Sequence, residues 1–183
     1  MSNTQLTRRA KFSERFRRIS AGIALGAIAI SIPIWLSACA TTDNTYEVHK
    51  PILATFKFDT RKTAQACPVT LVRGEKYHIS ARVIAADPWM DGGSPASPLG
   101  VDGPLTPQQK ADEASKRVRS ERRFKLMGSI GNGPNRATFP VGYDTELTPD
   151  ATGQLFLFVN DTPGDYFKNR GSAIIQVECI TPE

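Results

Sequence analysis

Beyond residue 50, apolar and polar residues alternate along most of the chain with the period of two that is typical of β-strands. Seven short segments are rich in β-branched and aromatic residues, and turn-forming Gly, Pro, Asp and Asn separate them. They are 51–58, 67–72, 76–85, 124–130, 137–143, 154–159 and 172–180. Their number and length predict one all-β domain over 51–183, an antiparallel β-sandwich or jelly roll.

Two segments interrupt the alternation. Residues 85–105 are dense in Gly, Pro and Asp, which predicts a long surface loop. Residues 106–120 predict the one short helix inserted in the domain, because Thr106 can cap it, Pro107 suits its first position and Gln109 completes a capping box. Nearly all its faces are polar, so we expect an exposed helix.

The first 38 residues have the composition of a secretory leader. A basic stretch at 1–18 precedes an apolar stretch at 21–36, which ends in the sequence LSAC. This ending resembles the lipobox of bacterial lipoproteins. The resemblance implies a signal peptide over 1–38, lipidation of Cys39 and a polar tether over 39–50.

An uncleaved membrane anchor is the alternative, since about 20 apolar residues can span a bilayer. Pro33 and the small residues near it favour the lipoprotein. The protein would then be held on the bacterial cell envelope by acyl chains such as palmitate. Ala40 stands where enteric-type bacteria place an Asp for inner-membrane retention, which favours the outer membrane, with the domain on its periplasmic or surface face.

The net charge of +5 belongs to the leader. Residues 1–38 hold 6 of the 23 basic and 1 of the 18 acidic side chains, so residues 39–183 hold 17 of each. A neutral domain lacks the electrostatic footprint of a nucleic-acid-binding protein. The local basic run at 116–125 is typical of a solvated face, with contact to lipid headgroups or anionic glycans as the alternative.

Cys67 and Cys179 remain once Cys39 is assigned to lipid. An even pair of cysteines in an oxidising compartment predicts a disulfide. The bridge would tie the first core strands to the last and stabilise the domain by about 4–5 kcal/mol in the loop-entropy model.

Little in the sequence indicates an enzyme. The two histidines are His49 in the tether and His78 on an expected outward strand face. Neither G-x-S-x-G nor H-E-x-x-H occurs, and no cysteine is left for catalysis. We expect a non-enzymatic protein.

The segment NDTPGDYFKNRG at 160–171 is the strongest candidate for a site. Asp161, Asp165, Asn169 and several free carbonyls are the hard oxygen ligands that calcium prefers, although their spacing is not that of an EF-hand. The same residue types also build an ordinary loop. On these residues alone, both readings stay open.

Three stretches carry a resemblance to a known family. They are KLMGSIGNGP at 125–134, FPVGYDTELTPDATGQLFLFVND at 139–161 and NDTPGDYFKNRGSAIIQV at 160–177. They resemble the PA-I galactophilic lectin (LecA-like) family of calcium-dependent, galactose-binding β-sandwich proteins. The first half agrees more loosely, in VRGEKYHISA and in the WMDGG to GVDGP loop.

The resemblance implies roles for several residues. Asp161 matches the carboxylate that binds calcium and sugar, Asp165 the residue whose backbone carbonyl binds the metal, and Asn169 an amide ligand. A carbonyl from 89–93 would complete the calcium site. We expect Asp91, Asp161 and Thr162 to bind ligand, with Trp89 as a stacking platform because an exposed aromatic in a Gly/Pro-rich loop is unusual. The alternative for Trp89 is that it plugs one end of the sandwich.

Two departures oppose a direct transfer of function. Lys168 stands where the family has its first amide ligand, and an ammonium has no acceptor for a metal. Lys168 could instead substitute for the metal by pairing with Asp161. The family's sugar-contacting histidine is also missing, so galactose specificity is not carried over.

We therefore hold a carbohydrate-binding lipoprotein as the first hypothesis, with glycan between the 85–105 and 160–171 loops. The alternative is a structural or protein-binding envelope lipoprotein that has lost sugar and calcium binding. A third hypothesis, an inhibitor of a hydrolase, has no motif behind it.

Overall fold

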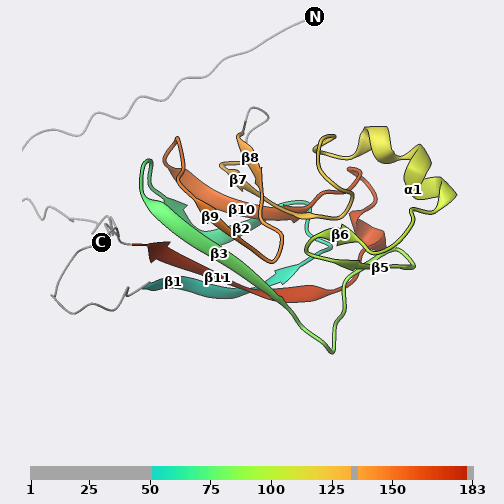
Figure 1. The fold of residues 1–183 in the computed structure, drawn as a ribbon, viewed down its shortest axis with the longest axis horizontal. Helices are drawn as coiled ribbons and strands as arrows, with labels where there is room; N and C mark the ends of the chain where they lie inside the picture. Colours follow the sequence, from blue (N-terminus) through green and yellow to red (C-terminus); the bar gives the residue numbers. More distant parts are fainter. Residues whose placement is uncertain (1–50, 133–135, 181–183) are drawn as a thin grey trace, which may run out of the picture. The chain divides into compact units, whose positions relative to one another are not determined.

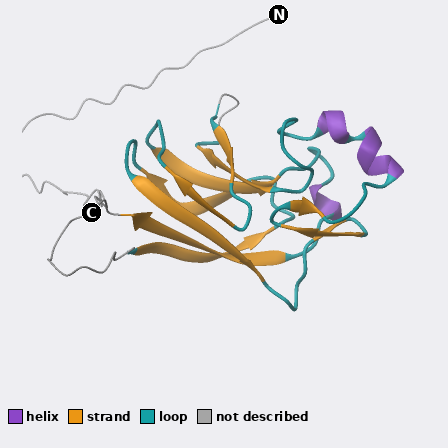
Figure 2. Cartoon of the chain, viewed as in Figure 1, coloured by secondary structure: helices purple, strands orange, loops and turns teal. Residues whose placement is uncertain are grey.

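The computed structural model describes residues 51–132 and 136–180, which form an antiparallel β-sandwich (Figures 1 and 2). One sheet has the order β1-β11-β3-β9, the second β2-β10-β7-β8, and a small third sheet β4-β5-β6. The first comprises β1 Ile52–Asp59, β11 Ser172–Ile180, β3 Lys76–Val83 and β9 Asp144–Leu147. The second comprises β2 Gln65–Leu71, β10 Gly153–Val159, β7 Leu126–Ile130 and β8 Thr138–Pro140. The third comprises β4 Met90–Asp91, β5 Ser94–Ser97 and β6 Gly100–Val101.

The sandwich core follows from the alternation along the strands. On β3, Tyr77, Ile79 and Ala81 are buried, while the residues between them are at least partly exposed. β11 pairs with β1 on one side and β3 on the other, so its alternate residues Ile175 and Val177 lie fully buried. The predicted all-β sandwich is confirmed, and each of the seven predicted segments contains a strand.

The residue pattern did not predict the short strands β4, β5, β6 and β9. β9 carries the charged sequence DTEL, and its pairing with β3 is what makes it a strand. These short strands form because their backbone pairs with a neighbouring strand. Their sequences lack the alternation of apolar and polar residues that would predict a strand.

The inserted helix is shorter than predicted. Helix α1 covers Pro107–Ala111, and a separate 3₁₀ helix covers Glu113–Ser115. The capping box is present as expected, with Thr106 Oγ1 accepting from Gln109 N and Gln109 Oε1 accepting from Thr106 N. The helix does not continue to 120, because the side chain of Asn160 binds the backbone of Val118, Glu121 and Arg122 instead.

The basic run at 116–125 is a solvated face only in part, since Arg119 and Arg122 are exposed and the other cations are at least partly buried. Lys116 is buried against Glu113, and Arg117 lies 3.7 Å above the ring of Phe158. Arg122, Arg123 and Lys125 also have partners within the domain, namely Val101 O, two aspartates and Glu121. These internal contacts leave few free cations for lipid headgroups, so that alternative loses its basis.

The predicted bridge between Cys67 and Cys179 is wrong, because the Cys67 thiol is free. Cys67 lies on β2 and Cys179 on β11, which belong to opposite sheets. Stacked sheets lie about 10 Å apart, whereas a disulfide needs Cα atoms about 4.4–6.8 Å apart. Cys67 instead packs into the core as a small apolar side chain.

Cys67 should resist alkylation in the folded protein. It is buried, and burial raises the pKa of its thiol to about 12, so little reactive thiolate exists near neutral pH. We expect iodoacetamide to label Cys67 only in denaturant without reductant, as read by mass spectrometry of its tryptic peptide. Rapid labelling of the native protein would contradict the packing, and no labelling in denaturant would restore the disulfide.

The leader, the lipidation of Cys39 and the tether lie outside the described residues and stay predictions. In the part of the chain that the structure describes, there is no helix with the length and apolar character needed to cross a membrane.

Candidate functional site

The two loops expected to form a site lie side by side. Met90 and Arg170 form an antiparallel bridge, with Met90 N donating to Arg170 O at 2.9 Å and Arg170 N donating to Met90 O at 3.0 Å. Gly171 follows at a φ of +106°, a backbone conformation that suits glycine. The bridge therefore fixes the 85–105 loop against the 160–171 loop.

Arg123 occupies the centre between these loops. Its Nε donates to Asp91 Oδ2 at 2.6 Å, and one of its Nη groups donates to Asp161 Oδ1 at 2.7 Å. The side chains of the arginine and the two aspartates are 3%, 7% and 0% exposed. One guanidinium thus joins a carboxylate from each loop in a buried ion-pair network.

Asp161 is saturated with hydrogen-bond donors. Besides Arg123, Thr162 N donates to its Oδ1 at 2.7 Å and Asn169 Nδ2 to its Oδ2 at 3.0 Å. Burial nevertheless raises the pKa of the Asp161 carboxyl above its ordinary value, against the lowering effect of these donors. The carboxylate therefore depends on its partners to stay ionised inside the domain.

Asp91 connects the network to helix α1. Gln109 Nε2 donates to Asp91 Oδ2 at 2.9 Å, while the same side chain closes the capping box of the helix. Gln109 is 6% exposed, and its side chain belongs to the site as well as to the capping box of the helix. The position of α1 is therefore coupled to the carboxylate that Arg123 binds.

Asn169 holds an unpaired acceptor beside Asp161. Its Nδ2 also donates to Thr60 O at 3.3 Å, but its Oδ1 is buried without a hydrogen-bond partner. A buried amide oxygen without a donor is costly in a folded protein. It is a buried ligand-type oxygen to which no described group donates.

Lys168 does not pair with Asp161, which was one alternative for it; it pairs with Asp165. Its Nζ lies 2.7 Å from Asp165 Oδ1, and both groups are at the surface. This contact raises the pKa of the Lys168 ammonium. The cation that enters the centre of the site is Arg123, which the sequence reading did not single out.

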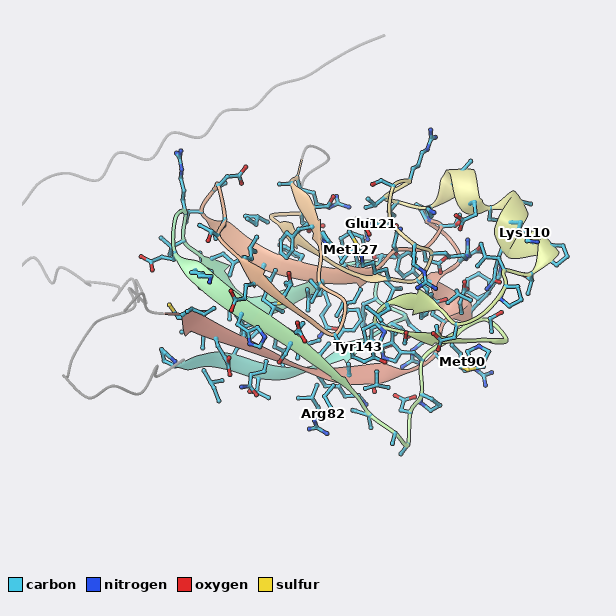
Figure 3. All side chains as sticks on the ribbon, viewed as in Figure 1. Arg82, Met90, Lys110, Glu121, Met127 and Tyr143 are labelled. Atoms are coloured by element: carbon cyan, nitrogen blue, oxygen red, sulfur yellow. The ribbon has the colours of Figure 1, made fainter. Side chains whose placement is uncertain are left out.

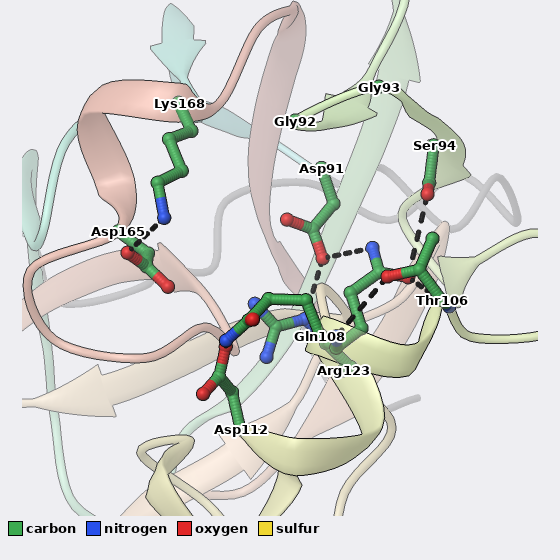
Figure 4. Close-up of a pocket in the computed structure, with 11 residues that line it drawn as sticks. Asp91, Gly92, Gly93, Ser94, Thr106, Gln108, Asp112, Arg123, Asp165 and Lys168 are labelled. Atoms are coloured by element: carbon green, nitrogen blue, oxygen red, sulfur yellow. Dashed lines mark hydrogen bonds and ion pairs between the residues drawn. The ribbon is translucent and has the colours of Figure 1, made fainter.

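A cleft of about 380 Å³, lined by residues with polar side chains and by two glycines, opens above this network (Figure 4). Its walls come from the β4–β5 turn, from α1 and its C-terminal end, and from the 3₁₀ helix Tyr166–Lys168. The lining side chains include Asp91, Ser94, Gln108, Asp112, Arg123, Asp165 and Lys168. Hydroxyl, amide, carboxylate and ammonium groups thus face one space.

The residues in place do not fit the calcium ion that the resemblance implies. A guanidinium already lies between Asp91 and Asp161, and an ammonium stands beside Asp165. The Asp165 carbonyl, the expected metal ligand, accepts from Lys168 N at 2.9 Å. Among the described residues, no group of three or more His, Cys, Asp or Glu is placed to hold a metal.

The predicted stacking platform is elsewhere. Trp89 is 1% exposed and packs between Phe58 and Phe124, with ring centroids 6.0 and 6.1 Å away. It plugs the core beneath the loops and cannot meet a ligand. An exposed aromatic residue next to the cleft is Phe167. It is 76% exposed, and Nζ of the cleft residue Lys168 lies 5.4 Å from its ring centroid.

His78 is not part of the cleft. It lies on β3, and its Nδ1 is 3.0 Å from Glu178 Oε2 on the outer face of the sheet. The cleft contains no histidine and no cysteine among its lining residues.

Comparison with known proteins supports the fold. No family model and no curated sequence matches the chain. Among solved structures, the domain is similar to the "EclA N-terminal domain; PllA-like lectin", with a TM-score of 0.51 and 22% identity over 70% of this chain and 97% of that one. At this identity the likeness concerns the fold alone, and the chain has a lectin-like β-sandwich.

Proposed function

We propose that this chain is a lipid-anchored, carbohydrate-binding module of the bacterial cell envelope, and that the cleft between the two site loops receives the glycan. The observation that carries the proposal is the cleft itself, a space lined by residues with polar side chains at the loop end of a lectin-like sandwich. A volume of about 380 Å³ falls within the range of about 300–1,000 Å³ typical of small-molecule sites.

The groups in the cleft suit a ligand rich in hydroxyls. Asp91 uses Oδ2 for both Arg123 and Gln109, and its other carboxylate oxygen makes no contact with the residues drawn in Figure 4. Asp112 accepts from Gln108 at 2.8 Å, and Lys168 has donors beyond the one that Asp165 uses. Carboxylate acceptors and cationic donors at close range can bind neighbouring sugar hydroxyls.

Phe167 supplies the apolar contact that a sugar ring needs. Sugar rings carry C–H groups on their faces, and an aromatic ring presents a flat apolar surface to them. An exposed phenylalanine leaves apolar surface in contact with water, which is unfavourable. A ligand that covers the ring removes this surface from water and gains affinity. Phe167 takes the role that we expected of Trp89.

Replacing Phe167 by alanine should weaken glycan binding about tenfold, equivalent to about 1.4 kcal/mol, and leave the thermal midpoint unchanged. The full chain, purified in detergent, would be screened on a glycan array, and affinities for the hits measured by calorimetry. Tyr143→Ala is the matched control, because Tyr143 is also exposed and does not line the cleft. It lies well away from Lys110 of helix α1, which forms one wall of the cleft (Figure 3).

Two negative results have different meanings. A wild-type protein that binds no glycan contradicts the proposed function. Equal affinities of wild type and Phe167→Ala would contradict only the role of Phe167.

A second function is favoured by the same exposed residue. Phe167 protrudes from a short 3₁₀ helix, and exposed aromatics are frequent anchors of protein interfaces. The chain would then be a non-enzymatic envelope lipoprotein that binds another protein and has lost sugar and calcium binding. Phe167→Ala would in that case abolish capture of an envelope protein, with no response to competing glycans.

A further inference from the structure

We propose that Arg123 takes the place of a divalent cation between the site loops, so that the site is built without metal, and that removing its guanidinium exposes a latent divalent-cation site.

The geometry of Arg123 is that of a cross-linking ion. It contacts a carboxylate of each loop, Asp91 at 2.6 Å and Asp161 at 2.7 Å. The two aspartates are 70 positions apart in the sequence, and without a cation between them their charges would repel. A guanidinium has a planar fork of donors that suits two carboxylates.

Arg123 is also built into the scaffold. Its carbonyl accepts from Val101 N at 3.1 Å, and the next residue, Phe124, donates from its N to Asn160 O at 2.7 Å. Phe124 has a φ of +65°, which is unusual for a bulky residue and turns the chain from Arg123 into β7. The cation is thus delivered by the fold rather than by a flexible side chain at the surface.

Bound calcium is incompatible with this arrangement. A calcium ion between the two carboxylates would lie against the guanidinium and would have to displace it. Hydrogen bonds also occupy both oxygens of Asp161. The wild-type protein should therefore show no saturable response to calcium.

Removal of the guanidinium changes the chemistry of the same place. Asp91 and Asp161 would face each other without a counter-ion, next to the unpaired Oδ1 of Asn169. These are three hard oxygen ligand groups, and water can enter the space left by the arginine to complete about 6–8 ligands. A site of this kind should bind calcium weakly, in the range of about 10⁻⁴–10⁻³ M.

The test is a calcium titration of wild type, Arg123→Ala, and Arg123→Ala with Lys168→Asn, with magnesium and matched ionic strength as controls. Thermal midpoints in calcium and in EDTA are the readout, with calorimetry on the folded variants. We expect no shift for wild type, a saturable rise for Arg123→Ala, and tighter binding for the double variant, since it regains an amide oxygen and loses a cation.

Each other result overturns part of the proposal. A saturable calcium shift in the wild type overturns the replacement of the metal by Arg123, and this arm does not depend on whether a variant folds. An Arg123→Ala protein that stays unfolded in calcium, or folds without responding to it, overturns the latent site. The probe is calcium alone, so the result is independent of glycan binding.

Discussion

Replacing Arg123 by alanine should lower the free energy of unfolding by about 3–5 kcal/mol when calcium is absent. The loss of one partner from a buried ion pair leaves a charge without compensation, which costs this amount in measured cases. Here two carboxylates, of Asp91 and Asp161, lose the same partner, and both are buried. Urea denaturation in EDTA measures the effect.

Arg122→Ala is the matched control for this prediction. Arg122 is the adjacent arginine, it is exposed, and its side chain donates to Val101 O. Its removal should change stability by less than about 1 kcal/mol. Equal losses for the two variants would contradict the central role of Arg123.

A second variant separates charge from packing. In Arg123→Ala combined with Asp161→Asn, one of the stranded charges is gone, so part of the lost stability should return. If the loss of stability came only from the cavity that the arginine leaves, Asp161→Asn would restore none of it. A double variant no more stable than Arg123→Ala would therefore show that the loss arises from the cavity.

The pH dependence of the same loss has a defined sign. Burial raises the pKa of the Asp161 carboxyl, and removal of Arg123 should raise it further. A carboxyl whose pKa is raised on folding destabilises the folded state while it is ionised, and this penalty falls as the group takes up a proton. The gap between wild type and Arg123→Ala should therefore be largest near neutral pH and narrow on acidification.

The alternation of apolar and polar residues predicted the sandwich. Successive side chains of a strand point to opposite faces, so a strand with one buried face needs an apolar residue at every second position. The alternation could not predict β9, because the sequence DTEL has one apolar residue, Leu147, and the strand is ordered by pairing with β3. The start of α1 was predictable from its capping box, which is local. Its end was not, because Asn160, about 40 positions away, binds the backbone of the segment after it.

In the site, too, some residues could be predicted from the sequence near them, whereas others depend on contacts between distant parts of the chain. The loop residues Asp161 and Asn169 could be picked out from the family resemblance of their segment, and the structure places them side by side. Arg123 stood in a basic run that is typical of a solvent-exposed helix, 32 and 38 positions from its two aspartates. Nothing local distinguishes it from Arg122, so only the fold identifies it as the central cation. The two interpretations of Trp89 could not be separated for the same reason, since a loop position does not reveal that the side chain points into the core.

Gly171→Ala should be the other strongly destabilising substitution, because it attacks the junction of the two site loops. A Cβ at position 171 would lie 2.5 Å from Pro88 O and 2.6 Å from Trp89 Cα. Both contacts are with backbone, so no side chain can rotate away, and the Met90–Arg170 bridge would have to open. We expect a loss of at least about 3 kcal/mol, with about 1–3 kcal/mol of it from the unfavourable φ, together with loss of glycan binding.

Gly164 offers a control, because its φ angle is nearly the same and a Cβ added there would have no near neighbour. Its φ is +105°, against +106° for Gly171, and a Cβ there would meet nothing within 4 Å. Gly164→Ala therefore carries the conformational cost without the steric clash, and the difference between the two variants isolates the contact between the loops. Chemical denaturation of both variants gives that difference. If it is near zero, the loops are not packed through Gly171, and the cleft above them could widen without loss of stability.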